Sequence, residues 1–203
     1  WIGLGQGQLS LNQLEAAVAS MDALIVLDAE SFQGHFERGQ ARSRQGLYEK
    51  ASADLNKALS IEVAYAEAYV ERALCLTHLN RVEEAINDLK QALALGLDDS
   101  ESVQTQLGLL YLRLGKLKSA GHAFLRTRDD RPFAPAEVGL ALILLRKDKN
   151  EEALAALKKA ESLSPLDGMP KALRAQVLAR LGRHEEATRA YQEALRLGFN
   201  VKI

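Results

Sequence analysis

The chain has 203 residues, of which 47% are hydrophobic and 26% are charged, and 26 basic against 27 acidic residues leave a formal charge of −1. This balance excludes a strongly basic nucleic-acid-binding module and an acidic disordered tail. Aromatic residues make up only 5% of the chain, which argues against a β-sandwich. A single cysteine excludes an internal disulfide and a cysteine-rich zinc site.

The sequence leaves the compartment open. The longest apolar run, residues 138–145, is too short to span a bilayer, so we expect no direct membrane insertion. We recognise no signal peptide. The chain begins with Trp1, however, so a missing signal is no evidence for a cytosolic location, and both a cytoplasmic and a periplasmic location stay possible.

Helix-like stretches follow one another in pairs that repeat about every 34 residues. The segment 48–61 returns at 82–95, 150–165 and 184–199, and each copy has apolar residues at i, i+3, i+4 and i+7, the spacing of one helix face. Other helix-like stretches lie between these copies, at 35–46, 104–115, 135–147 and 171–182. We therefore predict an all-α chain in which each copy consists of two helices joined by a short turn.

Turn and charge signals agree with this pairing. We expect the first helix of a pair to end at Gly46, Asn80, Gly115 or Gly182, because these residue types are typical after a helix C-terminus. Acidic pairs such as Glu83 with Glu84 come where the second helix begins, which suits the helix dipole.

The copy at 101–133 has small, aromatic and proline residues in a recognisable spacing, at Leu107, Gly108, Tyr111, Ala120, Phe124 and Pro132. On these residues the chain resembles the tetratricopeptide repeat (TPR) family. The resemblance implies a right-handed α-solenoid of stacked antiparallel helix hairpins, a single array over residues 1–203. Its units would be approximately 1–31 (partial), 32–65, 66–99, 101–133, 134–167 and 168–201.

Two irregularities interrupt the array. One extra residue is inserted at 98–100, and the second helix of the following unit ends as 126–131 with charged residues in place of the usual leucines. The second feature predicts either a frayed helix end or a hinge between the units up to 133 and those from 134.

No residue pattern indicates catalysis, a cofactor or a metal ion. The four histidines (His35, His78, His122 and His184) have no His or Cys partner three or four residues away. Cys75 lies among small and apolar residues of a predicted helix, so we expect it to pack in the core. The glycines at 3–7 have neither a preceding strand nor a following Gly-Lys-Ser/Thr. We therefore expect that this chain is not an enzyme.

The first helix of each pair carries apolar residues on a second face as well. In the TPR family the corresponding positions line a concave ligand groove, so the resemblance implies an apolar strip with a basic rim. The residues expected there are Arg44, Val70, Leu74, His78, Thr105, Leu109, Leu112, Arg113, Val138, Leu142, Leu145, Arg146, Gln176 and Arg180. Two packing explanations stay open: the strip packs against neighbouring first helices, and the basic residues complement helix C-termini.

These features predict a non-enzymatic scaffold that binds another protein or a peptide with apolar and acidic side chains. The carboxylate clamp of chaperone-binding TPR modules is not matched, because residues such as Phe36, Gln40 and Glu71 stand at its positions. One alternative is an assembly module, either a homo-oligomer or a platform within a larger multidomain protein such as a secretion or envelope complex. A second alternative, an RNA-binding helical repeat, is disfavoured by the balanced charge, so we expect no nucleic acid.

Overall fold

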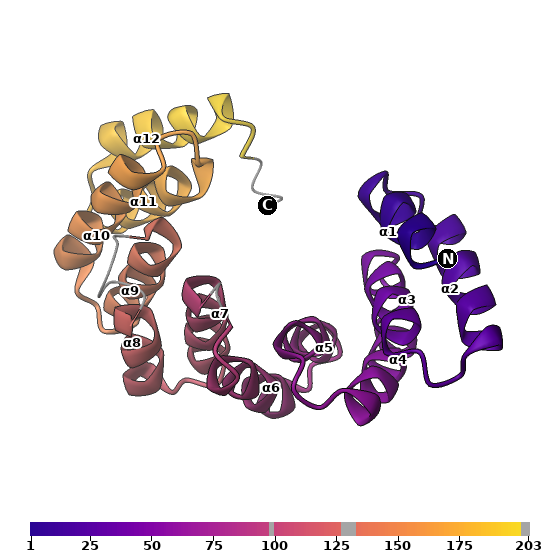
Figure 1. Ribbon diagram of the computed structural model, residues 1–203. Helices are drawn as coiled ribbons and strands as arrows, with labels where there is room; N and C mark the ends of the chain where they lie inside the picture. The colour runs from indigo at the N-terminus through magenta and orange to yellow at the C-terminus, as the bar shows by residue number, and fades with distance from the viewer. Residues whose placement is uncertain (98–99, 127–132, 200–203) are drawn as a thin grey trace. The chain divides into compact units, whose positions relative to one another are not determined.

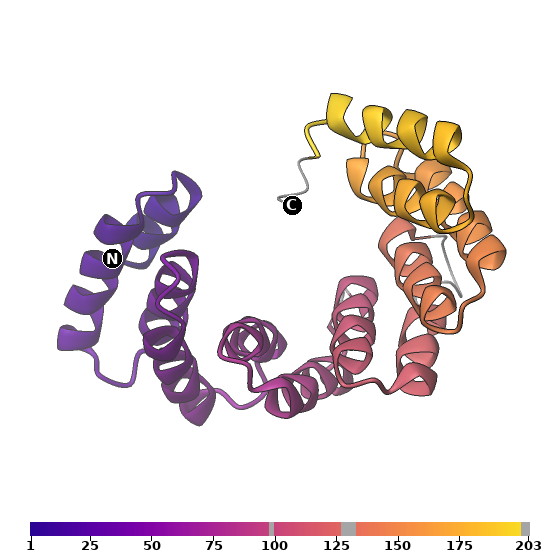
Figure 2. The same cartoon turned by 180° about the vertical axis from the view of Figure 1, so that it is seen from behind.

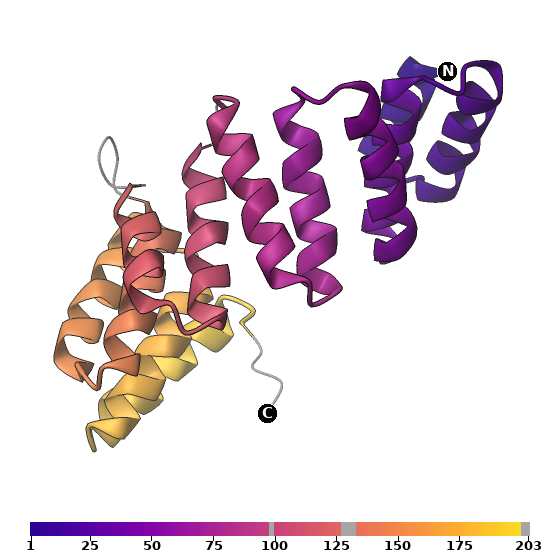
Figure 3. The same cartoon turned by 90° about the horizontal axis from the view of Figure 1, so that it is seen from below.

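The computed structural model of the chain describes residues 1–97, 100–126 and 133–199. Within these ranges all regular structure is α-helical and there is no strand, which confirms the predicted all-α helical-repeat fold. Figure 1 shows the helices as antiparallel pairs, which Figures 2 and 3 show from behind and from below. The helices are α1 (Ile2–Ser10), α2 (Leu14–Leu27), α3 (Phe32–Arg44), α4 (Tyr48–Ile61), α5 (Ala66–His78), α6 (Val82–Ala94), α7 (Ser100–Arg113), α8 (Leu117–Arg126), α9 (Ala134–Arg146), α10 (Asn150–Leu163), α11 (Gly168–Arg180) and α12 (His184–Arg196).

The chain divides into two compact units, residues 1–103 (unit 1) and residues 104–203 (unit 2). Unit 1 contains the hairpins α1/α2, α3/α4 and α5/α6, and unit 2 contains α8 and the hairpins α9/α10 and α11/α12. The boundary falls inside α7. Residues 98–99 and 127–131, which carry most of the predicted insertion and of the frayed end or hinge, lie outside the described residues.

Residues with left-handed backbone conformation end the first helix of each hairpin. The predicted stops all have positive φ: 78° at Gly46, 62° at Asn80, 71° at Gly115 and 74° at Gly182. In the hairpins α1/α2 and α9/α10 the same conformation is taken by Asn12 and Asp148. Asparagine and aspartate tolerate this region better than other side chains, so a glycine pattern alone finds only some of the turns.

Small residues let the helices approach closely. Ala51, Ala85 and Ala153 on three second helices are fully buried. In unit 2 the buried ring of Phe124 touches two first helices, because a Cβ atom added at Gly108 of α7 or at Gly139 of α9 would lie 2.4 Å from a ring atom. The glycines therefore make room for one aromatic ring between α7 and α9.

Candidate protein-binding surface

Only part of the predicted apolar strip is accessible. Leu74 of α5 in unit 1 and Leu109 of α7 in unit 2 are exposed, at 42% and 45% of their surface. Val70 of α5 and Leu142 and Leu145 of α9 are half-buried. Leu109 and Leu142 occupy one repeat position on successive first helices of unit 2, and Gln176 of α11, which is exposed, occupies that position on the next.

Three predicted strip residues are instead core residues. Thr105, Leu112 and Val138 are 7%, 4% and 6% exposed. Leu112 belongs to a buried cluster that includes Phe124 and Ile143. An apolar stripe at i, i+3, i+4 and i+7 covers a broad arc of the helix. Neighbouring helices cover part of that arc, and sequence periodicity does not reveal where the covered part ends.

The basic rim has largely internal contacts. Arg44 Nη1 at the end of α3 donates a hydrogen bond to the Leu9 carbonyl at the end of α1, at 3.0 Å. Arg146 Nη1 at the end of α9 donates to the Leu112 carbonyl at the end of α7 in the same way. Each arginine therefore adds a second hydrogen bond to a carbonyl at the C-terminus of the preceding first helix, which also accepts from the backbone N–H of Asn12 or Gly115. Arg44 and Arg146 therefore fit the explanation that basic residues complement helix C-termini. Each of them contacts the C-terminus of the neighbouring first helix and not that of its own helix.

The remaining rim residues, His78, Arg113 and Arg180, differ in their contacts within the chain. His78 of α5 stacks on Tyr48 of α4, with ring centroids 4.1 Å apart and an interplanar angle of 2°. Arg113 and Arg180 at the ends of α7 and α11 are exposed. Arg113 has a further interaction within the chain. The positive charge of the rim in unit 2 is therefore carried at the surface by Arg113, Arg146 and Arg180.

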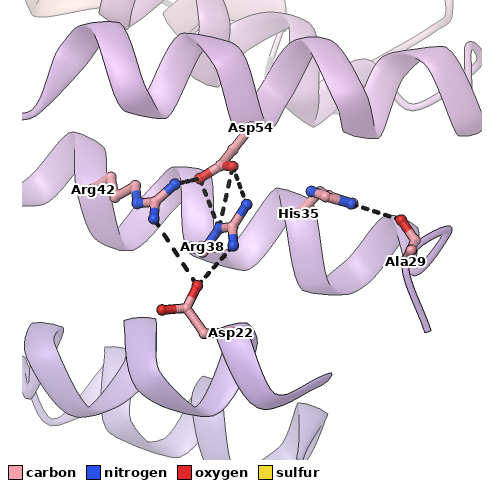
Figure 4. A network of polar contacts seen from close by, with 6 residues as sticks. All are labelled: Asp22, Ala29, His35, Arg38, Arg42 and Asp54. Atoms are coloured by element: carbon pink, nitrogen blue, oxygen red, sulfur yellow. Dashed lines mark hydrogen bonds and ion pairs between the residues drawn. The ribbon is translucent and has the colours of Figure 1, made fainter. Parts of the chain in front are cut away.

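A polar network in unit 1 was not found from the sequence. Arg38 of α3 donates to both carboxylate oxygens of Asp54 on α4, at 2.6 to 3.2 Å, and to Asp22 on α2 at 2.7 Å (Figure 4). Arg42 adds a 2.6 Å contact to Asp54, whose side chain is only 5% exposed. The network joins three helices and pairs its two arginines with two carboxylates, so that removal of one buried partner would leave a charge unpaired.

The same arrangement returns one repeat later. Arg72 of α5 donates to Asp88 of α6 at 2.6 and 2.7 Å and to Asn56 of α4 at 2.7 Å. Arg38 and Arg72, like Asp54 and Asp88, are 34 residues apart. A search for charged residues in register across the repeats would therefore have revealed these contacts.

First helices in unit 1 also exchange side-chain hydrogen bonds. Gln6 of α1 donates to Glu37 of α3 at 2.7 Å, and Gln40 of α3 donates to Glu71 of α5 at 3.0 Å. Glu37 is 3% exposed, and its second oxygen has no hydrogen-bond partner among the described residues. Burial raises the pKa of Glu37, and the hydrogen bond from Gln6 opposes that rise.

The described residues contain no cluster of metal-ligating side chains, and Cys75 is buried. No group of three or more His, Cys, Asp or Glu side chains within them could hold a metal ion. Cys75 is buried in a cluster with Leu55 and Phe36, and burial raises the pKa of its thiol, which opposes formation of the nucleophilic thiolate. Across the parts of the chain that the structure describes, no helix combines the length and the apolar character that crossing a bilayer requires.

Unit 2 also has an open hollow between α11 and α12, with a volume of about 470 Å³. Its lining is mostly apolar and contains no carboxylate, lysine or arginine. The residues that line it are Ala172, Ala175, Gln176, Ala179, His184, Ala187, Thr188 and Tyr191.

Comparison with protein-family models identifies the repeats. A tetratricopeptide repeat model matches residues 2–66 and 44–100, and a tetratricopeptide repeat-like domain model matches residues 125–200. The chain belongs to the TPR family. Members of this family are typically protein–protein interaction modules and are generally non-enzymatic scaffolds.

Similarity to individual proteins shows the fold and a distant relationship. The chain is 28% identical over 224 aligned residues to the DnaJ protein P58IPK homolog of Arabidopsis thaliana, an alignment that covers 97% of this chain and 44% of that protein. The chain spans less than half the length of the curated relatives it matches.

Two solved structures show the same helical-repeat fold. A tetratricopeptide repeat protein from Parabacteroides merdae has a TM-score of 0.82 and 20% identity, with 96% of this chain and 77% of that chain covered. YrrB, described as a TPR protein with an unusual peptide-binding site, has a TM-score of 0.64 and 18% identity, with 87% of this chain and 91% of that chain covered.

Proposed function

We propose that this TPR chain is a non-enzymatic scaffold that binds a peptide segment of another protein along the first helices of unit 2. The observation that carries the proposal is the exposure of Leu109, at 45%, on a helix whose other apolar faces are buried. The half-buried Leu142 and Leu145 extend this apolar surface on α9. Exposed apolar surface with a polar border is typical of interaction sites.

The charges at the border indicate which peptide fits. Arg113, Arg146 and Arg180 present exposed basic side chains at the ends of three successive first helices. The internal hydrogen bond of Arg146 fixes the position of its guanidinium group, and a guanidinium has donors to spare for a further acceptor. The partner in this proposal is a segment that places leucine-like side chains on the strip and acidic side chains beside these arginines. The peptide-binding description of YrrB agrees with this use of the fold.

Selection of peptides from a random library on the purified chain tests the proposal. We expect the selected peptides to combine leucine-like and acidic residues, and Leu109→Glu to weaken their binding by about tenfold or more, since a buried leucine contributes about 1.5–3 kcal/mol. Isothermal calorimetry measures the affinity, and circular dichroism checks that the helices are intact.

Leu125→Glu is the matched control. Leu125 of α8 is 46% exposed, almost the same as Leu109, but lies on a second helix. A general effect of adding a charge to unit 2 would weaken binding in both variants. Peptides that bind Leu109→Glu as tightly as the unchanged chain would refute the proposed surface.

A further inference from the structure

Unit 1 contains a polar hollow of about 180 Å³ between α4, α5 and α6, here called the unit 1 hollow. Its lining combines hydroxyl, amide, guanidinium and carboxylate groups with the side chain of Leu76. The residues that line it are Ser52, Asn56, Arg72, Leu76, Arg81, Glu84 and Asp88.

The preceding repeat has an arginine side chain where this hollow is open. Arg42 of α3 stands 34 residues before Leu76 of α5. Its guanidinium group donates to Asp54 of α4 at 2.6 Å and lies 4.0 Å from Asp22 of α2 (Figure 4). The leucine side chain at the same position of α5 ends at the atoms to which the guanidinium group of an arginine would be attached. The unit 1 hollow therefore lies where a guanidinium group is held one repeat earlier.

The buried carboxylate that lines the hollow has fewer hydrogen bonds than its counterpart. Asp54 accepts hydrogen bonds from two arginines, Arg38 and Arg42. Asp88, one repeat later, has a side chain that is 8% exposed, and among the described residues it accepts hydrogen bonds from Arg72 alone. An ionised carboxylate offers about four acceptor sites. Asp88 can therefore accept hydrogen bonds from a second donor.

Arg81 lines the same hollow but is engaged by another carboxylate. Its guanidinium group donates two hydrogen bonds of 2.7 Å to Glu84. Arg183 makes the same pair with Glu186 three repeats later. The pair is therefore a feature of the start of a second helix, and it does not supply the donor that Asp88 lacks.

The charge of the hollow favours one added cation. Its lining contains two basic and two acidic side chains. The equivalent positions one repeat earlier hold three basic and two acidic side chains, at Arg38, Arg42, Lys50, Asp22 and Asp54. Binding of one guanidinium group would therefore give the two sites the same charge, whereas an anion would be placed beside Asp88 and Glu84.

We propose that the unit 1 hollow binds an arginine side chain of a partner protein, in the place that Arg42 occupies one repeat earlier. The guanidinium group donates to the carboxylate of Asp88, and Ser52 and Asn56 supply further oxygen acceptors in the lining. Arginine fits better than lysine because its planar group matches a carboxylate with two parallel hydrogen bonds. This site goes beyond the peptide surface proposed for unit 2, and it selects a side chain of the opposite charge.

NMR titration of the ¹⁵N-labelled chain with N-acetylarginine amide, which mimics an arginine residue within a peptide, tests the site. We expect saturable shifts of the Arg72 Nε–H and Asn56 side-chain amide signals. N-acetylcitrulline amide has nearly the same shape without the charge, and it should bind about tenfold more weakly, because charge-assisted hydrogen bonds are roughly twice as strong as neutral ones. Free arginine that binds more tightly than the capped probe would refute a protein partner.

Two substitutions copy the preceding repeat. Asn56→Asp places a carboxylate at the position of Asp22 and should strengthen binding of the arginine probe by about tenfold. Leu76→Arg gives α5 its own guanidinium group, as on α3, and should abolish binding. Ser60→Asp is the matched control, because Ser60 is an exposed residue of α4 outside the hollow and the change adds the same charge. Circular dichroism checks that the helices of each variant are intact.

Three outcomes would overturn the proposal: equal binding of the arginine and citrulline probes, an equal gain from Asn56→Asp and Ser60→Asp, or unchanged binding by a folded Leu76→Arg chain. Acetate that shifts the same signals more strongly than the arginine probe would show an anion site instead. Leu109→Glu in unit 2 should leave this titration unchanged, so failure of this site and failure of the proposed peptide surface are distinguishable.

Discussion

The two compact units differ in how uniformly one repeat position of the first helices joins neighbouring hairpins. In unit 1 this position holds Arg38 and Arg72, each of which bridges the second helices on either side of it. In unit 2 the position varies. Arg174 of α11 contacts Glu161 of α10 and Glu193 of α12, whereas α9 carries Leu140, which packs against a buried cluster that contains Phe124. The repeat thus fixes where helices meet through small residues and turns, and leaves open whether ion pairs or apolar side chains fill the contact.

The largest effect should come from the apolar contact in unit 2. Phe124→Ala removes a fully buried ring and should lower the free energy of unfolding of unit 2 by about 3–5 kcal/mol. Hydrogen exchange should show lower protection in α9 and little change in α3 and α4. Equal loss of protection in both units would contradict the division of the chain into two units.

A second substitution sharpens this prediction. Gly139→Ala alone should destabilise unit 2, because its Cβ would lie 2.4 Å from the Phe124 ring. In the Phe124→Ala background the same change should become neutral or stabilising, by up to about 1 kcal/mol, since alanine favours helix over glycine. An unchanged sign in the double variant would show that the ring does not set the spacing between α7 and α9.

A smaller loss should follow from breaking the ion-pair network of unit 1. Asp54→Asn leaves Arg38 and Arg42 without the carboxylate that both contact, so we expect a loss of about 3 kcal/mol in the free energy of unfolding. Asp22→Asn is the matched control on the same arginine. The Asp22 side chain is 49% exposed, so its loss should cost about 1 kcal/mol or less and shrink further in salt. Similar losses for both variants would contradict the role of burial.

The smallest effect should appear as a pH dependence of unit 1. Because burial raises the pKa of Glu37 in the folded chain, folding is favoured while Glu37 is protonated, and this stability is lost as the pH rises through the folded-state pKa. Glu37→Gln stays neutral at all pH values. We therefore expect it to be more stable than the unchanged chain at pH 7, by about 1 kcal/mol, with the difference disappearing toward pH 4.

Glu71→Gln is the control for this pH dependence. Glu71 accepts the equivalent hydrogen bond from Gln40, but it is only half-buried, whereas Glu37 is 3% exposed. Chemical denaturation across this pH range measures both variants. A Glu71→Gln variant that gains as much stability at pH 7 as Glu37→Gln would show that burial of the carboxylate is not the cause.

The sequence determined the class of fold, the pairing of the helices and four of the turns. These features depend on short-range periodicity and on residues such as Gly46 and Asn80, whose preferences act within one or two helical turns. Register across repeats also singled out Gly108, Ala120 and Phe124, which are buried at helix contacts in the structure. These positions are set by the 34-residue spacing, which one sequence displays without further information.

Only the tertiary structure decided which apolar positions of the first helices are accessible. Leu109 and Leu112 look alike in a periodicity argument, yet the first is 45% exposed and the second 4%, because neighbouring side chains such as those of Phe124 and Ile143 cover one edge of the helix and not the other. The contacts of Arg44 and Arg146 with carbonyls 35 and 34 residues earlier were likewise fixed by how hairpins stack. Helical periodicity predicts the side of the helix from which each side chain projects. Whether that side chain is buried depends on the residues packed against that side, and these come from distant parts of the sequence.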